Sequence, residues 1–433
     1  MFDYYLGLAL RSLRRNKVLT ALMIVTLGLG IGASITTLTV LRLLSGDPLP
    51  QKSARLFYAQ VDPYTKDGYE AGKTKPQRLI AYTDAMNLLH AHQADRQVAL
   101  ALTDARIAPL RSGEHPFFSD GVMTTADFFT MFDAPFQYGG GWSAADDESR
   151  AQVVVISDFL NDKLFGGASS VGRIIRVNDH DLRIIGVLKK WAPQPRFYAQ
   201  ELGGRSYGDG DAVFLPLQTA RAANMDPTND DCWAVADITK LETAPCIWLG
   251  FWVELSSDAE VAAYTQFLSN YAQQQIALGR FYRPEVALSD LMQWLRNEKV
   301  VPDDVRLQAG LAFGFLLICV VNTVGLLLAK CLRRSQEIGV RRALGAMRRE
   351  IFAQFMVEAG MVGLAGGLLG LVFAEFGLWC IRHQPAEYAG LAHLDVHMFL
   401  LTFLVALVSS LVAGLLPAWR ASQLAPGSQL KAA

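Results

Sequence analysis

The sequence predicts an α-helical membrane protein with four transmembrane helices and a large α+β extracytoplasmic domain between helices 1 and 2. Four long apolar blocks, and a long polar stretch after the first of them, indicate this arrangement. Hydrophobic residues make up 51% of the 433, and the mean hydropathy of +0.21 is higher than a purely soluble protein would show. The 40 Lys and Arg against 41 Asp and Glu leave no excess positive charge for nucleic-acid binding.

The apolar blocks are each close to the length that crosses a bilayer, about 20 residues. Val18–Leu41 has 24 residues without a charged side chain, Ala309–Ala329 has 21 and Met398–Trp419 has 22. Ala359–Ile381 is interrupted only by Glu375, which would have to be housed inside the bundle. The first block exceeds the apolar core of a secretory signal, about 7 to 15 residues, so we interpret it as a retained span.

The charges outside these blocks predict the orientation. Residues 1–17, 330–350 and 420–433 together hold 13 basic and 3 acidic side chains, whereas the rest of the chain holds 27 and 38. Because basic segments stay in the cytoplasm, we expect both termini and the loop between the second and third spans there. The predicted segments are a cytoplasmic amphipathic helix at 1–17, spans at 18–44, 303–331 (with a stalk), 358–381 and 398–419, an external domain at 45–302, a cytoplasmic loop at 332–357, a short external loop at 382–397 and a cytoplasmic tail at 420–433.

Two helix ends carry further expectations. Residues 1–17 alternate apolar and basic side chains at helical spacing, which fits either a helix along the inner membrane surface or an extension of the first span. Pro302, Asp303 and Asp304 are typical of a helix start. A helix from there to Cys331 would exceed a hydrocarbon core of about 30 Å, so its outer part is expected to form a stalk.

The external domain shows mixed strand and helix patterns and is expected to pack helices on small sheets. Asn178, Asp179 and His180 stand between two strand patterns and predict a hairpin turn. The expected strands are Val98–Leu102, Val153–Ile156, Ile174–Val177, Leu182–Leu188, Val213–Leu217 and Trp248–Leu255. The expected helices are Ala126–Phe132, Asp158–Phe165, Ala259–Leu278 and Ser289–Asn297.

This domain offers little chemistry. The turn at Asp179–Asp181 splays its side chains apart, and the other acidic clusters lack calcium-loop spacing. Gly72, Lys73 and Thr74 match the end of a phosphate-binding loop, but no glycine stands five residues before Gly72 and no apolar strand leads in. We therefore expect no catalytic residue, no metal site and no cofactor or nucleotide site in this chain.

Five cysteines divide between the two regions. Cys319, Cys331 and Cys380 are in or beside spans and are expected to be packing residues. Cys232 and Cys246 lie in the external domain, where an oxidising compartment permits a disulfide. Two separate buried thiols are the alternative.

The basic cytoplasmic loop closely resembles a known family. The run from Arg333 to Ala346, with Glu337-Ile338-Gly339 at its centre, is similar to the loop after the second span in the MacB/FtsX superfamily of ABC transporter permeases, type VII. Residues 153–157, 164–167, 184–187 and 417–421 resemble the core domain and C-terminal tail of that family. Residues 190–250 match it poorly, apart from the strand at 213–217.

The resemblance implies a dimer of four-span permeases, made with a second copy or a paralogue, on two ABC ATPase subunits that bind ATP and Mg²⁺. The basic loop would be the coupling helix on which the ATPase docks; a basic loop that lies only on anionic membrane lipid is the alternative. The site residues carried over by this resemblance are Glu337, Ile338, Gly339, Arg341, Arg342, Leu344 and Gly345. Ile338 and Leu344 are expected to supply the apolar contacts.

Small residues recur at four-residue spacing in two spans, which indicates close helix packing, either within the bundle or at a dimer seam. They are Gly28 and Gly32 in the first span and Gly363, Gly366, Gly367 and Gly370 in the third. Two acids lie at opposite ends of the third span. Glu358 is expected at the cytoplasmic edge and Glu375 near the outer edge, without an assigned role.

These expectations favour the permease of an ATP-driven export machine in a bacterial inner membrane, with no enzymatic site of its own. A MacB-type exporter working with a periplasmic adaptor and an outer-membrane duct is preferred to a lipoprotein-extracting permease. The competing hypothesis is a membrane-tethered sensor whose external domain binds a ligand. An anchored hydrolase is disfavoured, since no nucleophile and base are paired in the sequence.

Overall fold

The computed structural model describes residues 7, 16–69, 72, 74–109 and 115–423. The chain divides into a helical unit, formed by residues up to 45 and from 301 onward, and a mixed unit formed by residues 46–300. The amphipathic helix expected at 1–17 lies almost wholly outside the described residues, as do Lys73 and the end of the tail. The predicted fold class, four membrane helices with an α+β domain after the first, is confirmed.

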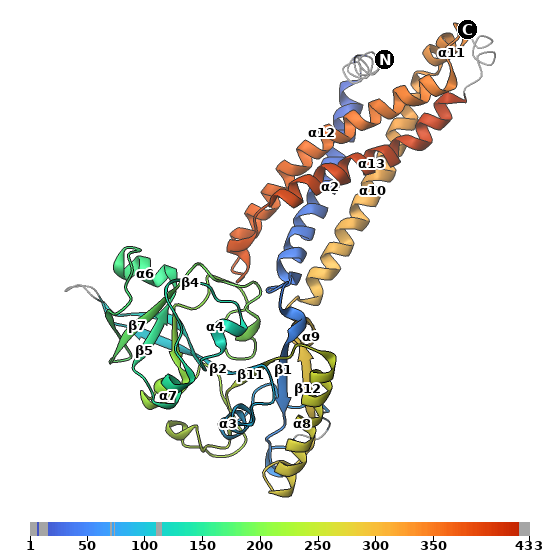
Figure 1. Cartoon of the computed structure of the whole chain (residues 1–433). Coiled ribbons are helices and arrows are strands. Elements are labelled where there is room, and N and C mark those ends of the chain that lie inside the picture. Colours follow the sequence, from blue (N-terminus) through green and yellow to red (C-terminus); the bar gives the residue numbers. More distant parts are fainter. Residues whose placement is uncertain (1–6, 8–15, 70–71, 73, 110–114, 424–433) are drawn as a thin grey trace. The chain divides into compact units, whose positions relative to one another are not determined.

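The helical unit is a bundle (Figure 1). Among the described residues, four helices are long and apolar enough to cross a membrane: α2 (Lys17–Ser45), α10 (Asp303–Arg333), α12 (Arg348–Arg382) and α13 (Val396–Ser422). Both α2 and α13 pack extensively on α10 and on α12, which places α10 and α12 across the bundle from each other. A short helix, α11 (Ser335–Ala343), connects α10 to α12.

Helix ends follow local chemistry. Asp303 and Asp304 occupy the first turn of α10, where acids interact favourably with the positive end of the helix dipole. The 31 residues of α10 span about 46 Å at ~1.5 Å per residue. α12 begins at Arg348, ahead of the span expected from 358, because the Glu350 carboxylate accepts a hydrogen bond from the Met347 amide at 2.9 Å and caps the helix there.

The mixed unit is built on one ten-stranded sheet rather than the small sheets expected. Its order is β12-β1-β11-β2-β3-β8-β5-β7-β4, with β6 pairing both β2 and β7. The strands are β1 (Leu56–Val61), β2 (Arg96–Ile107), β3 (Phe117–Thr124), β4 (Phe136–Gly139), β5 (Val153–Ile156), β6 (Ile174–Val177), β7 (His180–Leu188), β8 (Val213–Pro216), β11 (Gly250–Glu254) and β12 (Val286–Asp290). A separate ladder joins β9 (Asp231–Cys232) to β10 (Cys246–Ile247).

Seven α-helices of the described residues belong to the same unit as the sheet. They are α3 (Tyr82–Ala91), α4 (Phe128–Met131), α5 (Ala144–Glu148), α6 (Asp158–Phe165), α7 (Leu217–Ala222), α8 (Asp258–Ala277) and α9 (Leu291–Asn297), with short 3₁₀ turns between some of them. Ser157 caps α6 by accepting the Leu160 amide at 3.2 Å, and Gly166 ends it with a φ of 67°. The turn before β7 is at Asn178 and Asp179, whose φ angles are 45° and 70°.

Two predicted helices of this unit are corrected. The segment Ser289–Asn297 divides at Asp290: the residues before it pair with β1, and the Asp290 carboxylate accepts the Gln293 amide at 2.8 Å to start α9. Ala126–Phe132 contains only the short α4. Both helices are shorter than local periodicity predicts. In Ser289–Asn297 the reason is strand pairing with β1 and the cap at Asp290.

Candidate functional site

The connection between α10 and α12 is shaped by α11 and the glycine that follows it. Leu344 ends the helix, and Gly345 adopts a φ of +99°, a left-handed conformation that favours glycine. Nothing lies within 4 Å of a Cβ placed there, so the backbone angle alone accounts for the glycine. The chain then reverses within a few residues into α12.

One face of α11 is bound into the bundle. Ile338 is only 6% exposed and packs in a cluster with Cys331, Ile351 and Phe355, which also includes two alanines of α13. Gly339 beside it is buried too. The expectation that Ile338 contacts an ATPase is therefore corrected: its side chain anchors the helix to its own bundle.

The opposite face of α11 and the turn that follows it are apolar and open. Val340 is 56% exposed, Leu344 83% and Met347 52%, and we call these three residues the outward patch. Arg348 and Arg349 beside it are also exposed. The family-like run predicted Leu344 as an apolar contact but not Val340, although a spacing of four residues places both on one helix face.

The two arginines expected to dock a partner are held within the chain. Arg341 donates to Glu337 at 2.6 Å and to Gln354 at 3.0 Å, and Arg342 donates to the Ser422 carbonyl at 3.3 Å. Both side chains are half-buried. Glu337 also accepts a hydrogen bond from Arg334 at 3.1 Å. These charged side chains therefore bind one another within the chain and hold α11 against the ends of its neighbouring helices.

Glu358 has a partner that the sequence did not reveal. Its carboxylate, 1% exposed, accepts a hydrogen bond from Lys330, whose side chain is also 1% exposed, and lies 3.5 Å from the Arg334 guanidinium. Glu375, by contrast, is half-exposed and pairs with Arg382 of the same helix at 2.7 Å. Only the first of these two acids links different helices.

The six glycines of the spans lie at contacts inside the bundle. A Cβ on Gly28 or Gly32 would meet Leu369 or Phe373 of α12, at 3.2 and 2.6 Å. The glycines of α12 approach α2 through Gly366 and Gly370, and α13 through Gly363 and Gly367. Of the two alternatives left open by the spacing, the structure places these faces within one chain.

The mixed unit of residues 46–300 corresponds to the predicted external domain, and we call it the external unit below. In it, Cys232 and Cys246 form a disulfide across the β9–β10 ladder. Asp230 lies near both sulfurs, but thiols joined in a disulfide are not metal ligands. Cys319 and Cys331 are buried, in keeping with packing roles, and Cys380 is partly buried.

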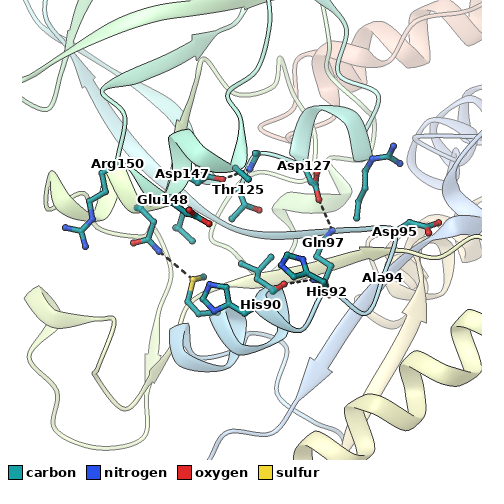
Figure 2. Close-up of a pocket in the computed structure, with 17 residues that line it drawn as sticks. His90, His92, Ala94, Asp95, Gln97, Thr125, Asp127, Asp147, Glu148 and Arg150 are labelled. Carbon is teal, nitrogen blue, oxygen red and sulfur yellow. Dashed lines mark hydrogen bonds between the residues drawn. The ribbon is translucent and has the colours of Figure 1, made fainter.

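The external unit also contains a cavity of about 440 Å³ beside α3, β2 and α5 (Figure 2). Asp127 and Asp147 face it, and each accepts a backbone hydrogen bond: from the Gln97 amide at 3.2 Å and from the Ala126 amide at 2.8 Å. Burial raises the pKa of Asp147 to about 7. His90 and His92 line the same cavity, with apolar side chains of α3.

Comparisons with known proteins agree with this architecture. Residues 20–271 match the model of the MacB-like periplasmic core domain, and residues 309–426 match the FtsX-like permease C-terminal model. The chain is 24% identical to the pyoverdine export ATP-binding/permease protein PvdT of Pseudomonas fluorescens over 96% of its length, and 25% identical to the macrolide export ATP-binding/permease protein MacB of Escherichia coli K12 over 98%. It spans 57% and 60% of these two relatives, respectively.

Among solved structures, the periplasmic region of MacB from Actinobacillus actinomycetemcomitans aligns with 59% of this chain and 97% of its own. The TM-score is 0.38 and the identity 12%. The extracellular domain of the transporter YknZ from Gram-positive bacteria aligns with 54% of this chain and 98% of its own, with a TM-score of 0.35 and 14% identity.

Four membrane helices with a large α+β domain after the first define a multi-pass membrane protein of the permease class. Since the core-domain model alone covers more than half of the chain, the chain belongs to the MacB/FtsX-like family of ABC transporter permeases.

Proposed function

We propose that this chain is the permease subunit of an ATP-driven export machine, in which α11 receives the motion of an ATPase and the bundle passes it to the external domain. The observation that carries the proposal is the outward patch, exposed on a helix whose other face is fixed by Ile338. An apolar patch flanked by Arg348 and Arg349 is complementary to a groove with an acidic rim.

The partners follow from this role. The ATPase would bind ATP and Mg²⁺, and a second permease copy or a paralogue would complete the dimer. A MacB-type exporter with an adaptor and an outer-membrane duct is preferred to a lipoprotein-extracting permease, because both curated relatives carry export in their names. Those names differ in the exported molecule, so the proposal extends to export and not to one substrate.

The outward patch gives a sharper test than the arginines, whose reversal would break contacts within α11. In membranes that coexpress the permease with its ATPase, the double variant Val340→Asp, Leu344→Asp should lower ATPase copurification at least tenfold, about 1.4 kcal/mol of binding free energy. Phe118→Asp, in the external unit and 71% exposed, is the matched control and should leave copurification unchanged.

Equal copurification with the patch variant would overturn the docking proposal. If instead the ATPase never copurifies with the wild type, and the patch variant loses affinity for vesicles containing anionic phosphatidylglycerol, the loop is a lipid-binding segment and the sensor hypothesis gains.

A further inference from the structure

The cytoplasmic ends of three helices are joined by a chain of polar side chains that we call the inner polar network. It comprises Lys330 and Arg334 at the end of α10, Glu337 and Arg341 on α11, and Gln354 and Glu358 on α12. Three of its members, Lys330, Gln354 and Glu358, are almost completely buried. Two members, Glu337 and Arg341, were expected from the sequence to dock an ATPase, and Glu358 had no assigned role.

The network begins between α10 and α12. The Lys330 ammonium group donates to one oxygen of Glu358, and the Arg334 guanidinium lies 3.5 Å from the other. These two helices both pack on α2 and α13 rather than broadly on each other. The buried ion pair is therefore a direct bond across the bundle.

From Arg334 the network continues onto α11 and returns to α12. Arg334 donates to Glu337 at 3.1 Å, Arg341 donates to the same carboxylate at 2.6 Å, and Arg341 also reaches Gln354 at 3.0 Å. Gln354 and Glu358 are four residues apart and so share one face of α12. Both ends of α11 are thus tied to the same strip of that helix.

Stability alone is a poor explanation for such a network. Removing two charges from water carries a large desolvation penalty, and well-packed apolar residues in place of a buried ion pair are often as stable or more so. Apolar side chains would not fix the orientation of the helix ends, whereas charged hydrogen bonds hold each helix end in one orientation relative to its neighbours. Such charges are useful where the helix ends must keep this orientation while a partner pushes on α11.

We propose that Glu358 is a positioning residue that locks α11 to the inner ends of α10 and α12, so that displacement of α11 moves α10 as one body with it. This inference rests on the proposed docking of an ATPase at α11. Glu358 does not contact the ATPase in this scheme, because it is buried beneath α11.

The first test needs no ATPase. In the full chain with Cys380→Ser, spin labels at exposed Gln336 on α11 and exposed Leu368 on α12 report the distance between the two helices by pulsed electron resonance. Glu358→Gln should at least double the width of this distance distribution. Glu375→Gln, which removes an acid from the same helix but one paired within it, is the matched control and should leave the width unchanged. An unchanged width in Glu358→Gln overturns the proposal.

The second test measures coupling in the complex with the ATPase. A cysteine at Leu307, exposed near the outer end of α10, should change its rate of maleimide labelling at least threefold when ATP is added to the wild type. In Glu358→Gln this ATP-dependent change in labelling rate should be lost, while ATPase copurification stays within twofold of wild type. Glu358→Asp keeps the charge and should restore part of the ATP-dependent change.

A variant that folds without the ion pair guards against simple misfolding. Lys330→Leu with Glu358→Leu replaces the pair by apolar side chains and should keep the thermal stability of the bundle but remain uncoupled. Normal ATP-dependent labelling in this variant would overturn the proposal. Loss of ATPase binding by the wild type would instead refute the docking proposal, and the spin-label result would still decide on the network.

Discussion

At the scale of single residues, Asp147 shows how burial changes an acid in the external unit. One carboxylate oxygen accepts the Ala126 amide, and the side chain is largely shielded from water at the edge of the cavity in Figure 2. Burial raises its pKa from 3.8 to about 7, so the folded state favours the protonated form. In the unfolded chain this carboxyl group loses its proton near pH 4, a much lower pH than in the folded chain.

The folded state should therefore lose stability as the pH rises from about 4 to 7, by on the order of 2 kcal/mol from this residue. Asp147→Asn cannot ionise, yet its amide oxygen can still accept the Ala126 amide, so the loss should disappear. Six of the eight tryptophans lie at residues 46–300, and their fluorescence during thermal unfolding at pH 5 and pH 8 measures the external unit.

The exposed neighbour Glu148 lines the same cavity and provides the control. Glu148→Gln should keep the pH dependence of the wild type. A midpoint difference between pH 5 and pH 8 that is equal in Asp147→Asn and the wild type would show that burial of Asp147 has no such effect.

Residue types and spacing predicted single positions unevenly. The family-like run at 333–346 predicted a docking segment, which stays a proposal, but it could not show that Ile338 is buried and Val340 exposed, because that depends on which face of α11 meets the bundle. The partner of Glu358 is Lys330, 28 residues away on another helix. Periodicity within a helix contains no information about a contact of that kind.

At the scale of elements, α11 has two faces with different roles, and truncation of one residue on each separates them. Ile338→Ala removes buried apolar contacts and should lower the free energy of unfolding by roughly 2 to 4 kcal/mol. Leu344→Ala, at a side chain 83% exposed, should change it by less than about 0.5 kcal/mol. Thermal unfolding of the purified permease in detergent measures both.

The docking proposal reverses this order for ATPase copurification. Leu344→Ala should weaken ATPase copurification while leaving the permease stable. Equal destabilisation by the two truncations would mean that α11 does not pack with Ile338 inward.

The contact between α2 and α12 gives a second prediction at this scale. Gly32→Ala places a methyl group 2.6 Å from the Phe373 Cβ and 3.1 Å from the Gly370 carbonyl, so the two helices must separate. We expect a loss of about 1 to 3 kcal/mol despite the higher helix propensity of alanine. Gly310→Ala on α10, where nothing lies within 4 Å, is the control and should be neutral or slightly stabilising; unfolding in detergent distinguishes the two.

Elements were easiest to predict where the signal is local. The four spans follow from apolar length, and the starts of α6 and α10 follow from the Ser157 cap and from Asp303 and Asp304 in the first turn. The single sheet was missed because its pairings are distant: Tyr58 of β1 pairs with Trp252 on one side and with Ser289 on the other. Such pairings are set by tertiary packing, which local strand propensity does not encode.

At the scale of the whole molecule, the proposed function requires that the external unit and α11 lie on opposite sides of the membrane. The excess of basic side chains in 330–350 and the excess of acidic ones in the remainder predict that arrangement. Along the chain α10 follows the external unit and precedes α11, so one crossing by α10 would separate them. If α10 failed to cross, the external unit and an ATPase at α11 would lie on the same side of the membrane.

Sided labelling measures this directly. In spheroplasts of cells that express the Cys380→Ser chain, a membrane-impermeant maleimide should label Phe118→Cys within minutes and leave Leu344→Cys unlabelled until the membrane is permeabilised. Both positions are strongly exposed, at 71% and 83%, so burial does not limit the reaction at either. Labelling of both in intact spheroplasts would place the external unit and α11 on one side, and energy released at α11 would then have no route across the bilayer.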